Sequence, residues 1–154
     1  MKFAKFLIFP ALILYTSFLS ATPKGVELFS PDTWSRISTA KSHAQVTIFT
    51  TTDCQHCPAV IEYLADFKKN NKKLNLRLNI VVMDGLGNED YLLSSPYYLL
   101  ANNLYAFNGS PSKLRYVVNP EWRGMTPFVV LHPLKQLPLY VYGKPDKAQL
   151  KVLN

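Results

Sequence analysis

The stretch Gln45–Phe67, which reads QVTIFTTTDCQHCPAVIEYLADF, decides the fold. Its first segment, Gln45–Phe49, combines β-branched and aromatic residues in the manner of a strand. Its last segment, Ala59–Phe67, repeats apolar residues at the spacing of one helical face. Between the two segments, Cys54 and Cys57 stand where a strand becomes a helix. A cysteine pair in this place can close a small disulfide and hold one thiol at a helix N-terminus, which is the chemistry of thiol-disulfide exchange.

The composition fits one compact domain. The chain has 154 residues, of which 48% are hydrophobic, and a formal charge of +7 that falls to +5 without Lys2 and Lys5. It has no dense basic block with interleaved aromatic residues, and the run Lys68–Lys73 is typical of the solvated end of a helix. We therefore expect no nucleic-acid partner.

The first 21 residues (1–21) have the pattern of a cleavable signal peptide. Lys2 and Lys5 precede the apolar run Phe6–Leu14, and Leu19–Ala21 offers small residues for cleavage. The alternative is an uncleaved membrane anchor, but a spanning helix needs about 20 apolar residues, and proline, serine and threonine interrupt this segment. We expect residues 22–154 to form the mature domain in an oxidising compartment, the bacterial periplasm.

The rest of the pattern predicts an α/β domain. The run 74–83 becomes continuously apolar, so it should pair in parallel with the strand 44–50 in a right-handed βαβ unit. The runs 126–132 and 137–142 are separated by a short loop, which predicts antiparallel neighbours. The other expected elements are an edge strand at 25–29, a helix at 32–41 and a short terminal helix at 145–153.

The interval 88–125 is expected to be a short helical insert. Residues 89–107 are rich in leucine and tyrosine, and Pro96 should divide them into two helical pieces. Residues 114–118 are apolar and are expected to be extended. Five aromatic side chains of this interval either fill the core or form an apolar ledge that grips unfolded chains or a partner: Tyr91, Tyr97, Tyr98, Tyr105 and Phe107.

The order of elements resembles the thioredoxin superfamily over nearly all of the mature chain. Val46–Cys57 is similar to the strand and active-site turn of exported disulfide oxidoreductases, and Gly124–Leu131 is similar to the Thr-Pro-led strand of DsbC-like isomerases. The resemblance implies an α/β, thioredoxin-like fold with a central mixed sheet flanked by helices and a short helical insert before the cis-proline strand. We expect no DsbC-type dimerisation domain, and the interval between Met83 and Thr126 is too short for a full DsbA-type helical domain. Single-domain disulfide isomerases of conjugative transfer systems are therefore the better comparison.

The reactive residues follow from chemistry and from this resemblance. Cys54 is expected to be the nucleophile, because a helix N-terminus stabilises its thiolate, and Cys57 the more buried resolving thiol. This pair is the redox-active disulfide, and no other cofactor is expected. The resemblance also implies that Pro127 is cis and faces the cysteines, which leaves the Thr126 backbone to pair with an extended substrate. An ordinary trans proline at the start of a strand is the alternative.

Three other residues of the turn should modulate the pair. His56 can stabilise the thiolate, as the His-containing motifs of DsbA and protein disulfide isomerase imply, unless it is only an exposed polar residue. Asp53 opposes this effect, since a carboxylate beside Cys54 disfavours a second negative charge. Gln55 completes the turn. Ile48 stands where thioredoxin-like proteins commonly bury an acid, so deprotonation of the resolving thiol would need water or another group.

Two functions agree with these residues. The first is a periplasmic oxidoreductase or isomerase that acts on cysteine-containing exported proteins, with a membrane redox partner and an envelope secretion or conjugation system as further partners. Its direction, whether oxidase, reductase or isomerase, stays open. The second is an interaction module whose disulfide is only structural. A zinc or copper site that combines the cysteines with His43, His56 and His132 is a weaker alternative, because the histidines are scattered, and no metal is expected.

Overall fold

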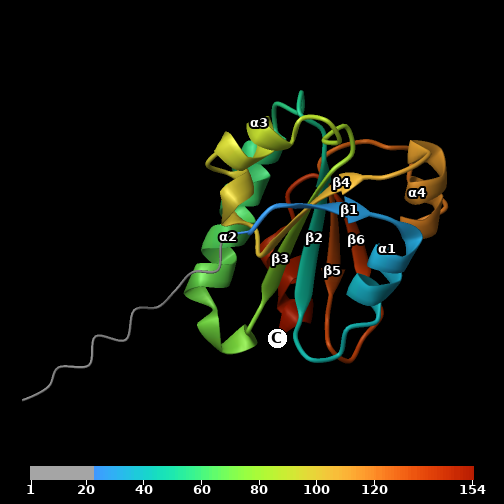
Figure 1. Cartoon of the computed structure of the whole chain (residues 1–154). Coiled ribbons are helices and arrows are strands. Elements are labelled where there is room, and N and C mark those ends of the chain that lie inside the picture. The colour runs from blue at the N-terminus through green and yellow to red at the C-terminus, as the bar shows by residue number, and fades with distance from the viewer. Residues whose placement is uncertain (1–22) are drawn as a thin grey trace, which may run out of the picture.

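A six-stranded mixed sheet forms the centre of the molecule (Figure 1). The structure is a computed structural model that describes residues 23–154. The strand order is β1-β4-β3-β2-β5-β6; the first four are parallel, β5 is antiparallel to β2, and β6 is antiparallel to β5. The strands are β1 (Val26–Phe29), β2 (Gln45–Thr50), β3 (Arg77–Val82), β4 (Asn103–Phe107), β5 (Phe128–His132) and β6 (Leu139–Tyr142). The α-helices are α1 (Pro31–Ser38), α2 (Cys57–Asn70), α3 (Glu89–Ser94), α4 (Pro111–Val118) and α5 (Lys147–Leu150), and the 3-10 helices are η1 (Lys72–Leu74), η2 (Tyr98–Leu100) and η3 (Lys151–Leu153).

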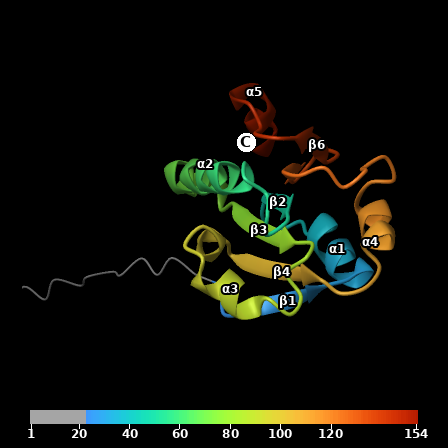
Figure 2. The ribbon, with the colours of Figure 1, turned by 90° about the horizontal axis from the view of Figure 1, so that it is seen from above.

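Helices cover both faces of the sheet, as Figures 1 and 2 show. On one face, α2, α3 and α5 enclose an aliphatic core that includes Ile48, Leu64 and Leu92. On the other face, α1 and α4 enclose an aromatic core that includes Phe49 and Trp34. Neighbouring residues of β2 enter opposite cores because side chains alternate across a strand. The predicted fold class, a central mixed sheet flanked by helices, is confirmed.

The local signals for the first strands and helices are also confirmed. The Ser30 side chain accepts a hydrogen bond from the Thr33 N–H at 3.2 Å, with Pro31 in the first turn, so α1 begins at the predicted start signal. The parallel pairing of β2 with β3 and the antiparallel pairing of β5 with β6 agree with the prediction. The terminal helix at 145–153 is shorter than expected and consists of α5 followed by η3.

The interval 88–125 differs from the prediction in two places. α3 and η2 are the two short helical pieces, but residues 103–107, which were expected to be helical, form β4. β4 lies between β1 and β3 and is buried on both faces, so its apolar run has no alternation to distinguish it from a helix. Residues 114–118, expected to be extended, belong to α4, which buries Leu114 and Val118 one helical turn apart and exposes Tyr116.

The aromatic residues of this interval divide between core and surface. Tyr98, Tyr105 and Phe107 are buried, which supports the core interpretation for these three. Tyr97 is half-buried, and Tyr91 is exposed with its hydroxyl 3.1 Å from the Tyr97 hydroxyl. Of the five aromatic residues, only Tyr91 is exposed as an apolar ledge that binds unfolded chains or a partner would require.

The predicted signal peptide, residues 1–21, lies outside the described residues. Within residues 23–154, no helix is both long enough and apolar enough to cross a membrane.

Candidate active site

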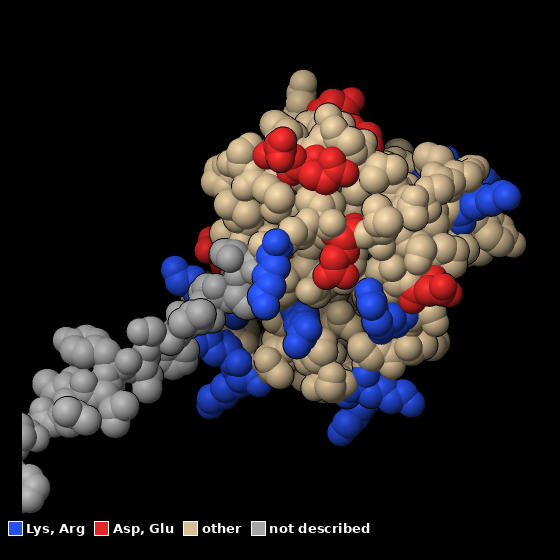
Figure 3. Space-filling view, viewed as in Figure 1, with Lys and Arg blue, Asp and Glu red and all other residues tan. Residues whose placement is uncertain are grey.

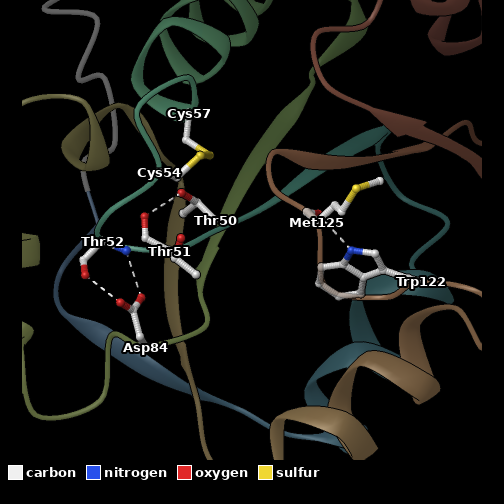
Figure 4. The surroundings of a disulfide bond; sticks show 8 residues. All are labelled: Thr50, Thr51, Thr52, Cys54, Cys57, Asp84, Trp122 and Met125. Atoms are coloured by element: carbon white, nitrogen blue, oxygen red, sulfur yellow. Dashed lines mark hydrogen bonds between the residues drawn. A yellow bond between two sulfur atoms is a disulfide. The ribbon is translucent and has the colours of Figure 1, made fainter.

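The cysteine pair lies after the carboxyl end of β2, in the turn that leads into α2 (Figure 4). The Cys54 N–H donates to the Thr51 carbonyl, and the Cys57 N–H donates to the Cys54 carbonyl, each at 3.3 Å. The two cysteines are joined in a disulfide with Cα atoms 5.5 Å apart. Cys57 is 1% exposed, whereas Cys54 is half-buried. Cys54 is therefore the more accessible of the two.

The turn ends at the N-terminus of α2, which begins at Cys57 with His56 as its N-cap. Cys54 thus precedes the helix by one turn and is not part of it. Pro58 has no N–H, and the Ala59 N–H has no hydrogen-bond acceptor within residues 23–154. An open donor and the positive end of the helix dipole consequently remain at this end, and both favour a thiolate over a thiol.

The other three residues of the turn face solvent. Asp53, Gln55 and His56 are exposed, and their side chains make no hydrogen bond or ion pair with any described residue. The structure therefore brings the imidazole and the carboxylate to the same exposed turn without pairing them.

Asp84, which the sequence did not mark as part of the site, supports the cysteine turn from the side of β3. Asp84, directly after β3, accepts a hydrogen bond from the Thr52 N–H at 2.9 Å and another from the Thr52 hydroxyl (Figure 4). The Asn88 side-chain amide donates to the Asp84 carbonyl at 3.1 Å and fixes the turn in which Asp84 stands. The sequence held one indication of this role. Asp84 follows a buried strand that was expected to be parallel to β2, and neighbouring parallel strands end at the same edge of the sheet.

The Thr126–Pro127 segment lies at the same end of the sheet as the disulfide. The peptide bond between the two residues is cis, and Phe128 pairs with Phe49, so β5 begins beside the end of β2. The Pro127 carbonyl accepts a hydrogen bond from the Gly143 N–H at 2.8 Å. By contrast, the Thr126 N–H and carbonyl have no hydrogen-bond partner within the described part of the chain. These two groups are available to an extended peptide.

Trp122 and Met125 complete this loop, and the sequence analysis did not identify them. The Trp122 indole N–H donates to the Met125 carbonyl at 3.0 Å, and the indole ring stacks on Phe128 with a centroid distance of 4.5 Å. The Met125 side chain is 62% exposed and belongs to the surroundings of the disulfide (Figure 4). A buried tryptophan thus fixes the backbone of an exposed methionine in the loop before the cis peptide.

Within the described part of the chain, no buried carboxylate lies near the cysteine pair. Ile48 is fully buried at the position where an acid would serve as a proton acceptor, and none of the Asp and Glu side chains of residues 23–154 is buried. The proton of a reduced Cys57 must therefore pass to water or to an exposed group.

The remaining histidines do not join the cysteines. His132 pairs with Gln45, the first residue of β2, and His43 precedes that strand, so both lie at the opposite end of the sheet. Among the described residues, no three His, Cys, Asp or Glu side chains gather in a way that could hold a metal ion.

Comparison with known proteins identifies the fold. No protein-family model matches the chain, and no curated protein sequence matches it. The structure is similar to that of a thioredoxin-related protein from Neisseria meningitidis serogroup B, with a TM-score of 0.52 and 18% identity over 73% of this chain and 83% of that one. It is also similar to a secreted Mycobacterium tuberculosis disulfide oxidoreductase homologous to E. coli DsbE, with a TM-score of 0.51 and 16% identity over 72% and 80% of the two chains.

A third similar structure is the thioredoxin domain of a thiol-disulfide oxidoreductase from Bacteroides vulgatus, with a TM-score of 0.54 and 14% identity over 74% of this chain and 81% of that one. The chain therefore has a thioredoxin-like fold, as the sequence resemblance implied. The finer assignment to a DsbC-like or DsbA-like subtype stays a prediction.

Proposed function

We propose that this protein is a periplasmic thiol-disulfide oxidoreductase or isomerase that acts on cysteine-containing exported proteins. One observation carries the proposal: a half-buried Cys54 is bonded to a buried Cys57 at the sheet end where the Thr126 N–H and carbonyl have no hydrogen-bond partner among the described residues. A solved structure of the same fold is that of a secreted disulfide oxidoreductase, which supports a location outside the cytoplasm.

The exchange proceeds through one mixed disulfide. In the oxidising direction, a substrate thiolate attacks the Cys54 sulfur, the bond to Cys57 breaks, and Cys57 leaves as a thiolate. A second substrate thiolate attacks the substrate sulfur of the mixed disulfide and releases Cys54. Two electrons have then passed from the substrate to the pair, and a membrane redox partner removes them. The reducing direction runs through the same steps in reverse.

The surrounding residues bind the substrate and tune the pair. The free N–H and carbonyl of Thr126 would pair with an extended substrate segment, while Pro127 holds that backbone at the start of β5. His56 would stabilise the Cys54 thiolate and Asp53 would disfavour it, with Gln55 shaping the turn between the cysteines. Components of an envelope secretion or conjugation system are the proposed source of substrates.

Activity assays on cysteine variants test the proposal. Cys54→Ser should abolish insulin reduction and the refolding of a scrambled disulfide protein. Cys57→Ser should instead accumulate the mixed disulfide with substrate, because the resolving thiolate is missing. If Cys54→Ser retains the wild-type rate in both assays, Cys54 is not the nucleophile and the proposal is wrong.

A redox titration separates this function from the second candidate, an interaction module with a structural disulfide. The absence of a buried carboxylate near the pair favours that candidate. A potential between about −120 and −230 mV marks an exchanging disulfide, whereas a potential below about −300 mV marks a structural one. We expect a value in the first range.

A further inference from the structure

The outer edge of β6 carries backbone groups without a partner. Among the described strands, β6 pairs with β5 alone and ends the sheet on its side (Figure 2). The Gly143 N–H donates to the Pro127 carbonyl at 2.8 Å, which continues the β5–β6 register by one residue. Hydrogen-bonded and non-hydrogen-bonded pairs alternate along an antiparallel ladder, so Tyr140 and Tyr142 direct their N–H and carbonyl groups away from β5. These four groups have no hydrogen-bond partner among the described residues.

The same two residues present exposed aromatic side chains. Tyr140 is 38% exposed and Tyr142 is 50% exposed. Both rings pack on the fully buried Phe128, with centroid distances of 6.0 Å and 5.0 Å. Two tyrosines at alternate positions of one strand therefore form an apolar surface on a fixed base. The side chains of a neighbouring extended segment could pack on this surface.

No charge protects this edge of the sheet. Residues 136–143 include no Asp, Glu, Lys or Arg. The other edge strand, β1, contains Glu27, which pairs with Arg36 at 3.7 Å. Both ends of the face seen in Figure 3 are charged, with basic side chains lowest and acidic side chains uppermost. Proteins commonly protect a free edge with a charge or a proline within the strand, and β6 has neither, so its edge is suited to accept a further strand.

We propose that the outer edge of β6 binds an extended apolar segment of the substrate protein as a seventh strand. The inference rests on the proposed function, because it assigns the edge to the same substrate whose thiol reacts with Cys54. The bond between Gly143 and Pro127 makes the edge continuous with the cis-proline segment of the cysteine site. A second copy of the chain fits less well, because antiparallel pairing of two β6 strands would bring Lys135 of each copy toward Lys144 of the other.

The sheet also sets the distance between this segment and the reacting cysteine. Cys54 follows β2, and a strand added to β6 would be the third strand from β2. Neighbouring strands lie about 4.8 Å apart, so the two places are separated by about 14 Å. An extended chain spans about 3.3 Å per residue, so about five residues must join the substrate cysteine to the added strand. The substrate class is therefore a chain in which large apolar residues alternate at least this far from a cysteine.

Exchange kinetics with reduced peptides test the proposal. In the first peptide, a linker of about six Gly and Ser residues joins a cysteine to the sequence Val-Tyr-Val-Tyr. In the second, the cysteine adjoins Val-Tyr-Val-Tyr directly, and in the third, the long linker leads to Ser-Gly-Ser-Gly. With the oxidised wild-type protein, KM should be about tenfold lower for the first peptide than for the other two.

Variants separate the backbone of β6 from its side chains. Tyr140→Ser removes one ring, and KM for the first peptide should rise about threefold. Tyr140→Pro also removes the outward N–H without breaking a bond to β5, so the protein should fold and KM should rise about fivefold further. The control Leu28→Ser removes a side chain that is 53% exposed on β1, at the opposite edge, and KM should stay within twofold of the wild type. All variants should react with dithiothreitol at the wild-type rate.

The outcomes distinguish the inference from the proposed function. Equal KM values for the three peptides, or an unchanged KM in Tyr140→Ser, would overturn the inference and leave the proposed function standing. Loss of folding in Tyr140→Pro, measured by circular dichroism, would show that this N–H is bonded within the protein and would also overturn it. A wild-type dimer in sedimentation equilibrium that Tyr140→Pro dissociates would assign the edge to a second copy instead. If the wild type exchanges with none of the peptides, the proposed function fails and the inference fails with it.

Discussion

The Trp122 indole N–H donates a hydrogen bond to the Met125 carbonyl at 3.0 Å, and this bond fastens the loop before the cis peptide to the aromatic core. The indole ring lies 4.9 Å from the Phe49 ring and 4.5 Å from the Phe128 ring. Since β2 and β5 carry these two rings, the loop is held by the same strands that position the cysteines. Trp122 thus contributes one hydrogen bond and the packing of its ring. A substitution by phenylalanine can remove the hydrogen bond while it keeps most of the packing.

We expect Trp122→Phe to impair substrate binding more than disulfide chemistry. The phenyl ring keeps most of the packing, but the Met125 carbonyl loses its donor, which should lower the free energy of unfolding by about 1 kcal/mol. With insulin as substrate, KM should rise severalfold while the reaction of the protein disulfide with dithiothreitol stays near the wild-type rate. The control is Trp34→Phe, because Trp34 lies in the same core and makes no hydrogen bond to this loop. Equal changes in both reactions would show that Trp122 acts on the cysteines and not on the loop.

Asp84 gives a second test, because it braces the cysteine turn from β3 through Thr52. Asp84→Ala removes both acceptors, and we expect the free energy of unfolding to fall by about 1–2 kcal/mol and the cysteine turn to loosen. Asp84→Asn retains one acceptor and should lose less. Urea denaturation measures the first effect, and amide hydrogen exchange at Thr52 measures the second. Asp90→Ala, at an exposed acid without a side-chain hydrogen bond, should leave both quantities unchanged. Protection at Thr52 that survives Asp84→Ala would contradict the bracing role.

The sequence contained enough to predict five of the six strands and the cysteine turn. β2 and α2 have distinct periodicities, and their junction placed Cys54 and Cys57 without any long-range information. β4 was missed for a physical reason: a strand buried on both faces has no polar face, so its pattern equals that of a short buried helix. α4 was missed because only two of its residues, Leu114 and Val118, are buried.

The residues that support the site, Asp84 and Trp122, were harder to predict from the sequence. Asp84 and Trp122 act through contacts with Thr52 and Met125, and the first of these contacts joins segments 32 residues apart in the sequence. Neither residue carries a motif, since a carboxylate after a strand and a tryptophan in a loop both occur for many reasons. Their roles appear only when the strand order is known.

The buried amides of the sheet lead to a third prediction. Asn79 is fully buried; its amide donates to the Gln45 side-chain oxygen at 2.9 Å, and its own oxygen accepts from the Asn103 amide at 2.8 Å. Asn79→Leu would leave both partners without this bond inside the sheet. We expect the free energy of unfolding, measured by urea denaturation, to fall by about 2–4 kcal/mol. Asn70→Leu, at the exposed end of α2, should cost little. A neutral effect of Asn79→Leu would mean that water replaces the lost partners.

His132 lies close to these amides, because it pairs with Gln45 across β5 and β2. The surroundings of its imidazole ring disfavour a positive charge. It is 7% exposed, its ring centroid is 5.3 Å from that of Trp34, and its Nε2 atom has no hydrogen-bond partner among residues 23–154. Burial lowers the pKa of His132 to about 4 from an ordinary value of 6.5. The folded protein therefore holds this imidazole neutral at pH values where the unfolded chain binds a proton.

The fourth prediction is a pH dependence of stability that belongs to this histidine. Between pH 4 and 6.5 the unfolded state binds the proton and the folded state does not, so the free energy of unfolding should fall as the pH is lowered through this window and stay level above it. The full loss is about 3 kcal/mol, measured by urea denaturation at a series of pH values. In His132→Phe, which keeps a ring against Trp34 and cannot titrate, most of the slope should vanish. His43→Gln, at a less buried histidine, should keep it. A slope that persists in His132→Phe would assign the acid sensitivity to other groups.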